Sequence, residues 1–298
     1  MRLLLTGVHG QLGSALLPRL KPLGDLTVVT RADCDLSSPE AVRRLVQEVK
    51  PDVVINPAAY TLVNDAETHS DLAFAINRDA PATLASECLK LGAIFVHYST
   101  DYVFDGSKAG EYTEQDEPHP LNVYGASKLA GERAVAAVGG RYLILRTSWV
   151  YSAHGTNFLL TMRKLARERE ELKVVDDQVG SPTSARQLAE ATVRLVQTYS
   201  GTATDAFPSG LYHATAGGSV SWCGFARAIV ESSRLHDNLK VQRILPISSA
   251  EFPSPAHRPL NSVLSNSKFE RVFGFRLSSW RDGMEEVLRE LEQGKASH

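Results

Sequence analysis

The chain of 298 residues is long enough for one large α/β domain or two smaller ones, and a hydrophobic fraction of 43% can fill a sizeable core. Its 32 Lys and Arg residues nearly balance 34 Asp and Glu residues, without a basic, aromatic-rich run typical of nucleic-acid binding. The three cysteines, Cys34, Cys88 and Cys223, lack metal-site spacing, so buried free thiols are expected. With no signal peptide or membrane-spanning run expected either, we predict a cytoplasmic protein with neither nucleic-acid nor membrane partners.

Short apolar runs alternate with longer helical patterns through the first part of the chain. Strands are predicted at 2–7, 26–30, 53–59, 94–100, 142–150 and 172–177, and helices at 11–22, 39–49, 71–90, 122–138 and 156–169. The strands are apolar throughout, which is typical of strands covered on both faces. The pattern predicts an α/β fold built on a doubly wound parallel sheet of the Rossmann type.

The pattern becomes looser after residue 150. Loops rich in Ser, Thr, Gly and Pro are predicted at 200–210 and 253–260, with helices at 184–199, 221–234 and 279–292. We therefore expect a sheet domain over 1–150 and a smaller C-terminal lobe over 151–298, partly interleaved with the sheet domain.

The segment "TGVHGQLG" spaces Gly7, Gly10 and Gly13 three residues apart, directly after the first strand and at the start of the first helix. Glycines there permit a tight turn and a close approach of the backbone to a pyrophosphate, which the helix N-terminus then binds. This predicts a dinucleotide site, with an ordinary glycine-rich turn as the alternative.

The end of the second strand bears on the choice of dinucleotide. An acidic residue there binds the ribose 2′-hydroxyl of NAD, whereas an arginine accommodates the 2′-phosphate of NADP. Arg31 stands at that position and Asp33 follows slightly late. NADPH is therefore favoured over NADH, with a solvated surface arginine as the alternative.

The segment "VYGASKLAGE" places Tyr124 and Lys128 four residues apart at the start of a predicted helix, so both side chains share one face. A phenol is a poor proton donor at neutral pH, and a neighbouring ammonium is expected to lower its pKa. The helix comes soon after Ser99 and Thr100, which end the fourth strand at the sheet edge where ligands bind.

The segments "TGVHGQLG", "NPAAYT", "HYSTDYVFDG", "PLNVYGASKLAGE", "LRTSWVY", "DDQVGSPT" and "RPLNS" together resemble the extended short-chain dehydrogenase/reductases, from residue 1 to about residue 290. More closely they resemble the members that reduce the C4 ketone of dTDP-4-dehydro-6-deoxy-L-mannose to dTDP-L-rhamnose. The resemblance implies an NAD(P)-binding domain over 1–150 and a mainly substrate-binding lobe over 151–298.

The resemblance also implies roles for individual residues. Tyr124 would protonate the C4 oxygen, Thr100 would hydrogen-bond it, and Lys128 would lower the phenol pKa and hold the nicotinamide ribose. The implied cofactor contacts are Gly7, Gly10, Gln11, Leu12, Gly13, Arg31, Asp35, Leu36, Ala58, Ala59, Tyr60, Ser99, Tyr124 and Lys128. The implied substrate contacts are Thr61, Val63, Thr100, Asp101, Tyr102, Tyr124, Trp149 and Arg258.

Other activities of this fold remain as alternatives. Related dehydratases carry a glutamate where this chain has Tyr102, so water elimination is disfavoured. Epimerases and other nucleotide-sugar 4-reductases are excluded less firmly, and the face of C4 that receives hydride is left open. A cofactor-binding regulatory subunit, resembling that of methionine adenosyltransferase, is the alternative from another class.

Some family members bind a divalent cation through acidic residues after the third glycine and near the helix that follows "GSPT". This chain has Ala15 and Arg186 in those regions. No metal ligand is predicted, a Mg²⁺ requirement is doubtful, and either a monomer or a homodimer is expected.

Overall fold

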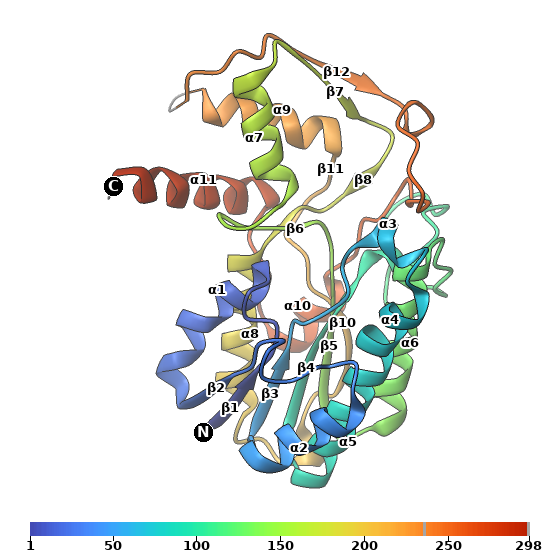
Figure 1. Ribbon diagram of the computed structural model, residues 1–298, viewed down its shortest axis with the longest axis vertical. Coiled ribbons are helices and arrows are strands. Elements are labelled where there is room, and N and C mark those ends of the chain that lie inside the picture. The colour runs from blue at the N-terminus through green and yellow to red at the C-terminus, as the bar shows by residue number, and fades with distance from the viewer. Residues whose placement is uncertain (235–236, 297–298) are drawn as a thin grey trace.

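The computed structural model describes residues 1–234 and 237–296. Residues 235–236 and 297–298, which belong to the predicted C-terminal lobe, lie outside the described residues. A six-stranded sheet runs through the lower part of the molecule in Figure 1, in the order β10-β5-β4-β3-β1-β2, and every neighbouring pair is parallel. The strands are β1 (Arg2–Leu5), β2 (Asp25–Val28), β3 (Val53–Asn56), β4 (Ile94–Thr100), β5 (Arg141–Thr147) and β10 (Gly210–His213). The predicted parallel sheet is confirmed.

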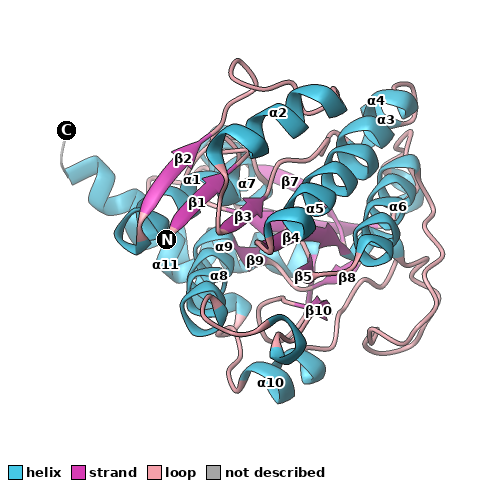
Figure 2. Ribbon diagram, turned by 90° about the horizontal axis from the view of Figure 1, so that it is seen from below, coloured by secondary structure: helices cyan, strands magenta, loops and turns pink. Residues whose placement is uncertain are grey.

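Helices cover both faces of the sheet (Figure 2). One face packs against α1 (Gln11–Leu20) and α8 (Ala185–Tyr199), the other against α2 (Pro39–Val49), α5 (Ala80–Leu91) and α6 (Val123–Val138). Alternate residues of β1 show the division, because Leu3 and Leu5 join the first core and Leu4 joins the second. All three leucines are fully buried, as strands covered on both faces require.

The sixth strand of the sheet is β10, which corrects the sequence analysis. The predicted strand at 172–177 is β7 (Glu171–Val175), but it leaves the sheet and pairs in parallel with β12 (Arg243–Ile247). Strand β10 follows the predicted loop 200–210 and adds to β5 with Tyr212 opposite Leu145. Its four residues are too few to carry a clear apolar period, and only pairing with β5 makes them a strand.

The helix predicted over 71–90 is interrupted. It consists of α4 (Ser70–Phe74), a π-helical segment η2 (Ala75–Asp79) and α5, with Pro81 in the first turn of α5. Proline has no N–H to continue a hydrogen-bond ladder, and single π turns in helices often lie at functional sites. The wide turn holds Asn77 with its side chain completely buried.

The C-terminal lobe lies above the carboxyl ends of the sheet strands (Figure 1) and has its own core, built on Leu159, Phe225, Ile229 and Met284. Its helices are α7 (Phe158–Glu168), α9 (Trp222–Ser233) and α11 (Trp280–Ala296), with small pairings of β6 (Val150–Tyr151) to β9 (Thr183–Ser184) and β8 (Val179–Gly180) to β11 (Val220–Ser221). The remaining elements are η1 (Lys21–Leu23), α3 (Val63–Ala66), η3 (Asp101–Val103), η4 (Thr204–Ala206), η5 (Ser249–Glu251) and α10 (Ser267–Phe273).

All three cysteines are free and buried, as predicted. Cys34 and Cys88 belong to the core on the α2 and α5 face of the sheet, and Cys223 belongs to the core of the lobe. Across the described residues, no helix combines the length and apolarity needed to cross a membrane.

Candidate active site

The carboxyl ends of β1, β3, β4 and β5 meet at one edge of the sheet, which is the edge where ligands bind in doubly wound folds. Thr100 ends β4 opposite Thr147 of β5, and Asn56 ends β3 opposite His97. The lobe covers this edge (Figure 1). The site is therefore formed by loops of the sheet domain on one side and by the lobe on the other.

The glycine loop has the shape that a dinucleotide site requires. Gly7 has a φ of +58°, and a Cβ there would lie 2.7 Å from the backbone nitrogen of Ala58. A Cβ on Gly13 would lie 2.0 Å from the Gly7 carbonyl oxygen, so helix α1 can approach the loop only with glycine at this position. Gly10 caps α1 without a side-chain partner, which leaves the first helical N–H groups for a phosphate.

The two residues after Gly10 have different environments. Leu12 is buried in the core that α1 shares with the sheet, so only its backbone can face a ligand. Gln11 donates to the Thr156 carbonyl oxygen at 3.2 Å and accepts from Asn157 Nδ2 at 3.1 Å. Gln11 therefore joins the glycine loop to the start of α7 in the lobe.

The loop after β2 contains the residues predicted for the adenosine end of the cofactor. Arg31 is exposed and lies near Asp35, whose pKa is lowered mainly by hydrogen bonds from Ser37 and further by the arginine. Asp33 accepts from the backbone N–H of Thr30 and is thereby held in the loop. A charged guanidinium is thus available to solvent at the end of β2.

The chain after β3 turns past the glycine loop and is held by Asn77 of η2. Asn77 Oδ1 accepts from the backbone N–H of Tyr60 at 2.8 Å, and its Nδ2 donates to the Tyr60 carbonyl and to Ser127 of α6. The Tyr60 hydroxyl donates to Asp65, which raises the pKa of the phenol. Ala58 therefore lies against Gly7, and Tyr60 lies between the glycine loop and α6.

Thr100 and Tyr124 lie together at the end of β4. Asn122 caps α6 by accepting from the backbone N–H of Gly125 at 2.7 Å, so Tyr124 is in the first turn of the helix. Its phenol is hydrogen-bonded to the Thr100 side chain, which opposes the larger effect of burial, and burial raises the pKa of Tyr124. The phenol stays protonated at neutral pH and can act as a proton donor.

Lys128 lies one turn further along α6 and is 2% exposed. Its Nζ donates to the Tyr98 carbonyl oxygen at 2.6 Å, and burial lowers the pKa of Lys128 to about 8. The expectation that Lys128 lowers the pKa of Tyr124 is wrong in this structure, because burial dominates both groups. Helical spacing placed the two residues on one face, but it could not include the cost of desolvation.

Asp101 is buried behind Thr100 and does not face the open side of the site. Its carboxylate accepts from the Thr100 hydroxyl at 3.0 Å and from the Ser148 hydroxyl at 3.0 Å. Burial raises its pKa to about 6, although the hydrogen bonds from Ser262, Thr100 and Ser148 act in the opposite direction. Asp101 therefore positions the threonine, and direct contact with a substrate remains a prediction.

Tyr102 connects Tyr124 with the loop that contains Arg258. The rings of Tyr102 and Tyr124 meet edge to face with centroids 5.9 Å apart, and Tyr102 is hydrogen-bonded to Arg258. Arg258 also donates to Asn64 at 3.2 Å, next to the predicted residue Val63. The structure therefore brings the segment at 61–64 and Arg258 to the rim of the site, where Thr61 is exposed.

Trp149 follows β5 with a φ of +48°, a left-handed conformation that is uncommon for a bulky residue. Its indole stacks on Trp222 of α9 with ring centroids 3.4 Å apart and an interplanar angle of 2°. A Cβ on Gly180 would lie 2.5 Å from the Trp149 ring. The tryptophan is thus held between the lobe helix and the backbone of β8.

A nicotinamide cofactor fits these residues. The glycine loop packs so closely on Ala58 and on its own backbone that a Cβ on Gly7 or Gly13 would clash, and Gly10 gives the N-terminus of α1 no side-chain cap. The Ser99 hydroxyl is a buried polar atom without a hydrogen-bond partner among the described residues. Ser99 lies at the end of β4 beside Thr100, where a polar group of a ligand would satisfy it. Both observations agree with the predicted cofactor contacts.

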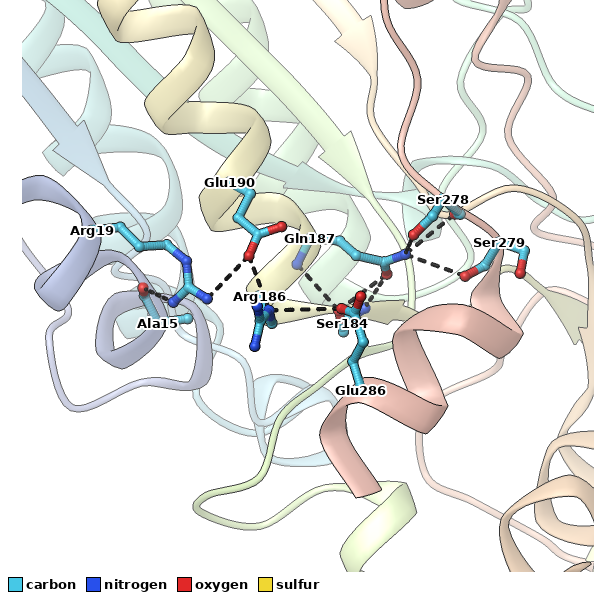
Figure 3. Close-up of polar contacts among 9 residues, drawn as sticks. All are labelled: Ala15, Arg19, Ser184, Arg186, Gln187, Glu190, Ser278, Ser279 and Glu286. Carbon is cyan, nitrogen blue, oxygen red and sulfur yellow. Dashed lines mark hydrogen bonds and ion pairs between the residues drawn. The ribbon is translucent and has the colours of Figure 1, made fainter. Parts of the chain in front are cut away.

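Figure 3 shows the region of Ala15 and Arg186, where the sequence predicts no metal ligand. Arg19 of α1 donates to the Ala15 carbonyl at 2.9 Å and pairs with Glu190 of α8 at 3.2 Å. Arg186 pairs with the same Glu190 at 2.9 Å and with Glu286 of α11 at 3.7 Å. Two guanidinium groups occupy the carboxylates, so this cluster does not suit a divalent cation.

Four residues of the site were missed by the sequence analysis: Asn56, His97, Asn77 and Trp222. Asn56 and His97 are polar residues inside apolar strands, and this signal could have marked them. Asn77 and Trp222 carry no such signal, because each acts on a segment far away in the chain.

Comparisons with known proteins show the family of the chain. The family model described as RmlD substrate binding domain matches residues 1–293. A dTDP-4-dehydrorhamnose reductase of Burkholderia thailandensis is 48% identical over 98% of this chain and 99% of its own length. The enzyme of the same name from Escherichia coli K12 is 40% identical, over 98% of each chain.

Solved structures show the same relationship in three dimensions. A dTDP-4-dehydrorhamnose reductase of Bacillus anthracis, in complex with NADP, aligns with a TM-score of 0.89 and 38% identity over 97% of this chain and 99% of the other. The match of the family model to nearly the whole chain, and identities well above 30% over full length, establish the relationship. The chain belongs to the RmlD substrate binding domain family.

Proposed function

We propose that the protein is an NADPH-dependent oxidoreductase that reduces the C4 ketone of dTDP-4-dehydro-6-deoxy-L-mannose to dTDP-L-rhamnose, the last step of dTDP-rhamnose synthesis. The observation that carries the proposal is the pairing of Thr100 with a protonated Tyr124, at the sheet edge beside the glycine loop. The curated relatives named dTDP-4-dehydrorhamnose reductase support the choice of substrate.

The side chains of this site have separate tasks in the proposed reaction. A reduced nicotinamide, when bound, supplies the hydride. Tyr124 gives its phenolic proton to the C4 oxygen, and Thr100 turns the hydroxyl proton that it donates to Asp101 in the free protein toward the same oxygen. Lys128 holds the nicotinamide ribose. Because the pKa of Tyr124 is raised, the phenol keeps this proton until the ketone oxygen becomes more basic during the reaction.

The substrate side of the site recognises a nucleotide sugar. Arg258 and Tyr102 form a hydrogen-bonded pair beside Tyr124, and the stacked pair of Trp149 and Trp222 forms an aromatic wall on the lobe side. A guanidinium binds phosphate oxygens well, and an aromatic edge can pack against a sugar or a base. Thr61 and Val63 complete the rim of the site.

We further propose that NADPH is preferred to NADH and that activity needs no divalent cation. Exposed Arg31 at the end of β2 supports the first point, because a 2′-phosphate would find a cation there. The ion pairs of Arg19 and Arg186 with Glu190 support the second. The enzyme is proposed to act in the cytoplasm as a monomer or a homodimer.

The test is NADPH oxidation on addition of the dTDP-linked keto sugar, followed by NMR of the product. Formation of dTDP-L-rhamnose is the expected result. A product with the opposite configuration at C4 would replace this substrate assignment by another nucleotide-sugar 4-reductase. NADPH binding without oxidation of any keto sugar would favour a cofactor-binding regulatory subunit instead.

A further inference from the structure

A buried hydrogen-bonded chain leads from the first strand of the sheet to Lys128. The Thr6 hydroxyl donates to Asn56 Oδ1 at 2.5 Å, and Asn56 Nδ2 lies 3.2 Å from His97 Nδ1. The other ring nitrogen, His97 Nε2, lies 3.3 Å from Lys128 Nζ. Thr6, directly after β1, thus joins β3, β4 and α6 in one continuous row of polar groups beneath the candidate active site.

The ring of His97 is neutral. It is completely buried and stacks on Phe95 with centroids 5.8 Å apart, and burial together with Lys128 keeps its pKa well below the ordinary value. A neutral imidazole has one N–H and one acceptor nitrogen. Lys128, with a pKa of about 8, is an ammonium at neutral pH and can only donate, so Nε2 accepts from it. The ring proton then lies on Nδ1, the nitrogen beside Asn56, whose backbone is hydrogen-bonded to the ring.

The other groups around Lys128 do not repeat this contact. Glu132 lies one turn further along α6, but its carboxylate is bound at both oxygens by Arg146 of β5, at 2.8 and 2.6 Å. The Tyr98 carbonyl of β4 accepts one N–H of the amine. Of the nearby groups on η3, Asp101 is bound by Thr100 and Ser148, and Tyr102 is bound by Arg258.

We propose that His97 is a positioning residue for Lys128: its Nε2 accepts one N–H of the ammonium, and so holds the side chain in place and favours its charged form. Asn56 sets the direction of this hydrogen bond, because its backbone is hydrogen-bonded to the other side of the ring. This inference deepens the proposed function, since it assigns the device that orients and tunes one of its catalytic residues.

Two substitutions of His97 separate the contact with Lys128 from packing. A glutamine amide can reach the position of Nε2, so the carbonyl oxygen in His97→Gln keeps an acceptor for the lysine. An asparagine amide reaches only the position of Nδ1, so His97→Asn keeps the contact with Asn56 and loses the contact with Lys128.

The measurement is the titration of Lys128 by NMR of protein labelled with ¹³C at lysine Cε, from about pH 6 to about pH 11. The Lys128 signal is assigned by its loss in Lys128→Met. His97→Asn should lower the titration midpoint by about one pH unit, and His97→Gln should leave it within about 0.3 unit. Circular dichroism of each variant shows that it is folded.

An unchanged or raised midpoint in folded His97→Asn would overturn the inference, as would equal shifts in His97→Asn and His97→Gln. The pH profile of kcat is a second readout. The apparent pKa in this profile that belongs to Lys128 should shift in the same direction as the NMR midpoint. If the wild type fails to reduce the keto sugar while the midpoint shifts as expected, the proposed function is wrong and the assignment of His97 stands.

Discussion

Replacement of Tyr124 by phenylalanine tests the chemistry at the centre of the proposed function. The change removes one hydroxyl, whose hydrogen bond with Thr100 contributes about 1 kcal/mol to stability. The ring keeps its edge-to-face contact with Tyr102, at 5.9 Å between centroids. Neither the glycine loop nor Lys128 depends on the hydroxyl, so the fold and the binding of NADPH should change little.

Catalysis should fall far more than stability. A positioned general acid contributes about 10²-fold to about 10⁴-fold, so kcat for reduction of the keto sugar should fall by that factor in Tyr124→Phe. The assay is single-turnover NADPH oxidation at saturating sugar, with the Kd for NADPH measured separately by fluorescence. Tyr112→Phe is the matched control, because Tyr112 is a buried phenol stacked on Phe104, away from Thr100. A rate in Tyr124→Phe within about threefold of the control would refute the assignment of the proton donor.

Four further predictions concern the cofactor, the lysine, a buried carboxylate and metal. Arg31→Asp should reverse or narrow the preference for NADPH, and equal kcat/KM for both cofactors in the wild type would contradict the role of Arg31. Lys128→Met should lower kcat and also raise the Kd for NADPH, and a change in kcat alone would argue against contact with the ribose. Burial raises the folded-state pKa of Asp101 to about 6, so its contribution to stability is complete below the unfolded value and is lost as pH rises through about 6. Between about pH 4 and about pH 7, the free energy of unfolding of Asp101→Asn, measured with urea, should therefore rise by about 2 kcal/mol relative to that of the wild type. A difference between the two proteins that stays constant with pH would mean that the carboxyl titrates normally. Finally, EDTA should leave activity intact, and a loss restored by Mg²⁺ would show that the cluster around Arg186 binds metal.

The aromatic pair on the lobe side shows how a local signal can be incomplete. The family resemblance implies that Trp149 lies in the substrate site, but nothing near it in the chain indicates a left-handed φ. That conformation depends on Trp222, about seventy residues later, and on the missing side chain of Gly180. A strained backbone persists only where surrounding contacts compensate for it, and those contacts belong to the tertiary structure.

Local patterns were enough to predict the parallel sheet, the glycine loop and the shared helix face of Tyr124 and Lys128. Each depends on short-range rules: apolar runs between turns, a strand followed by glycines and a helix, and a spacing of four residues. Strand β10 could not be predicted in the same way, because four residues become a strand only when β5 supplies their partners.

The pKa values of the site were decided by the tertiary structure alone. The sequence predicts that Lys128 lowers the pKa of Tyr124, since charges one helical turn apart interact. Folding buries both groups, and the loss of hydration raises the pKa of the phenol and lowers that of the amine. The same burial brings His97 to Lys128 from a different strand. Sequence spacing determines which groups can meet, whereas the surrounding packing determines how much water they keep and therefore which of them carry a charge.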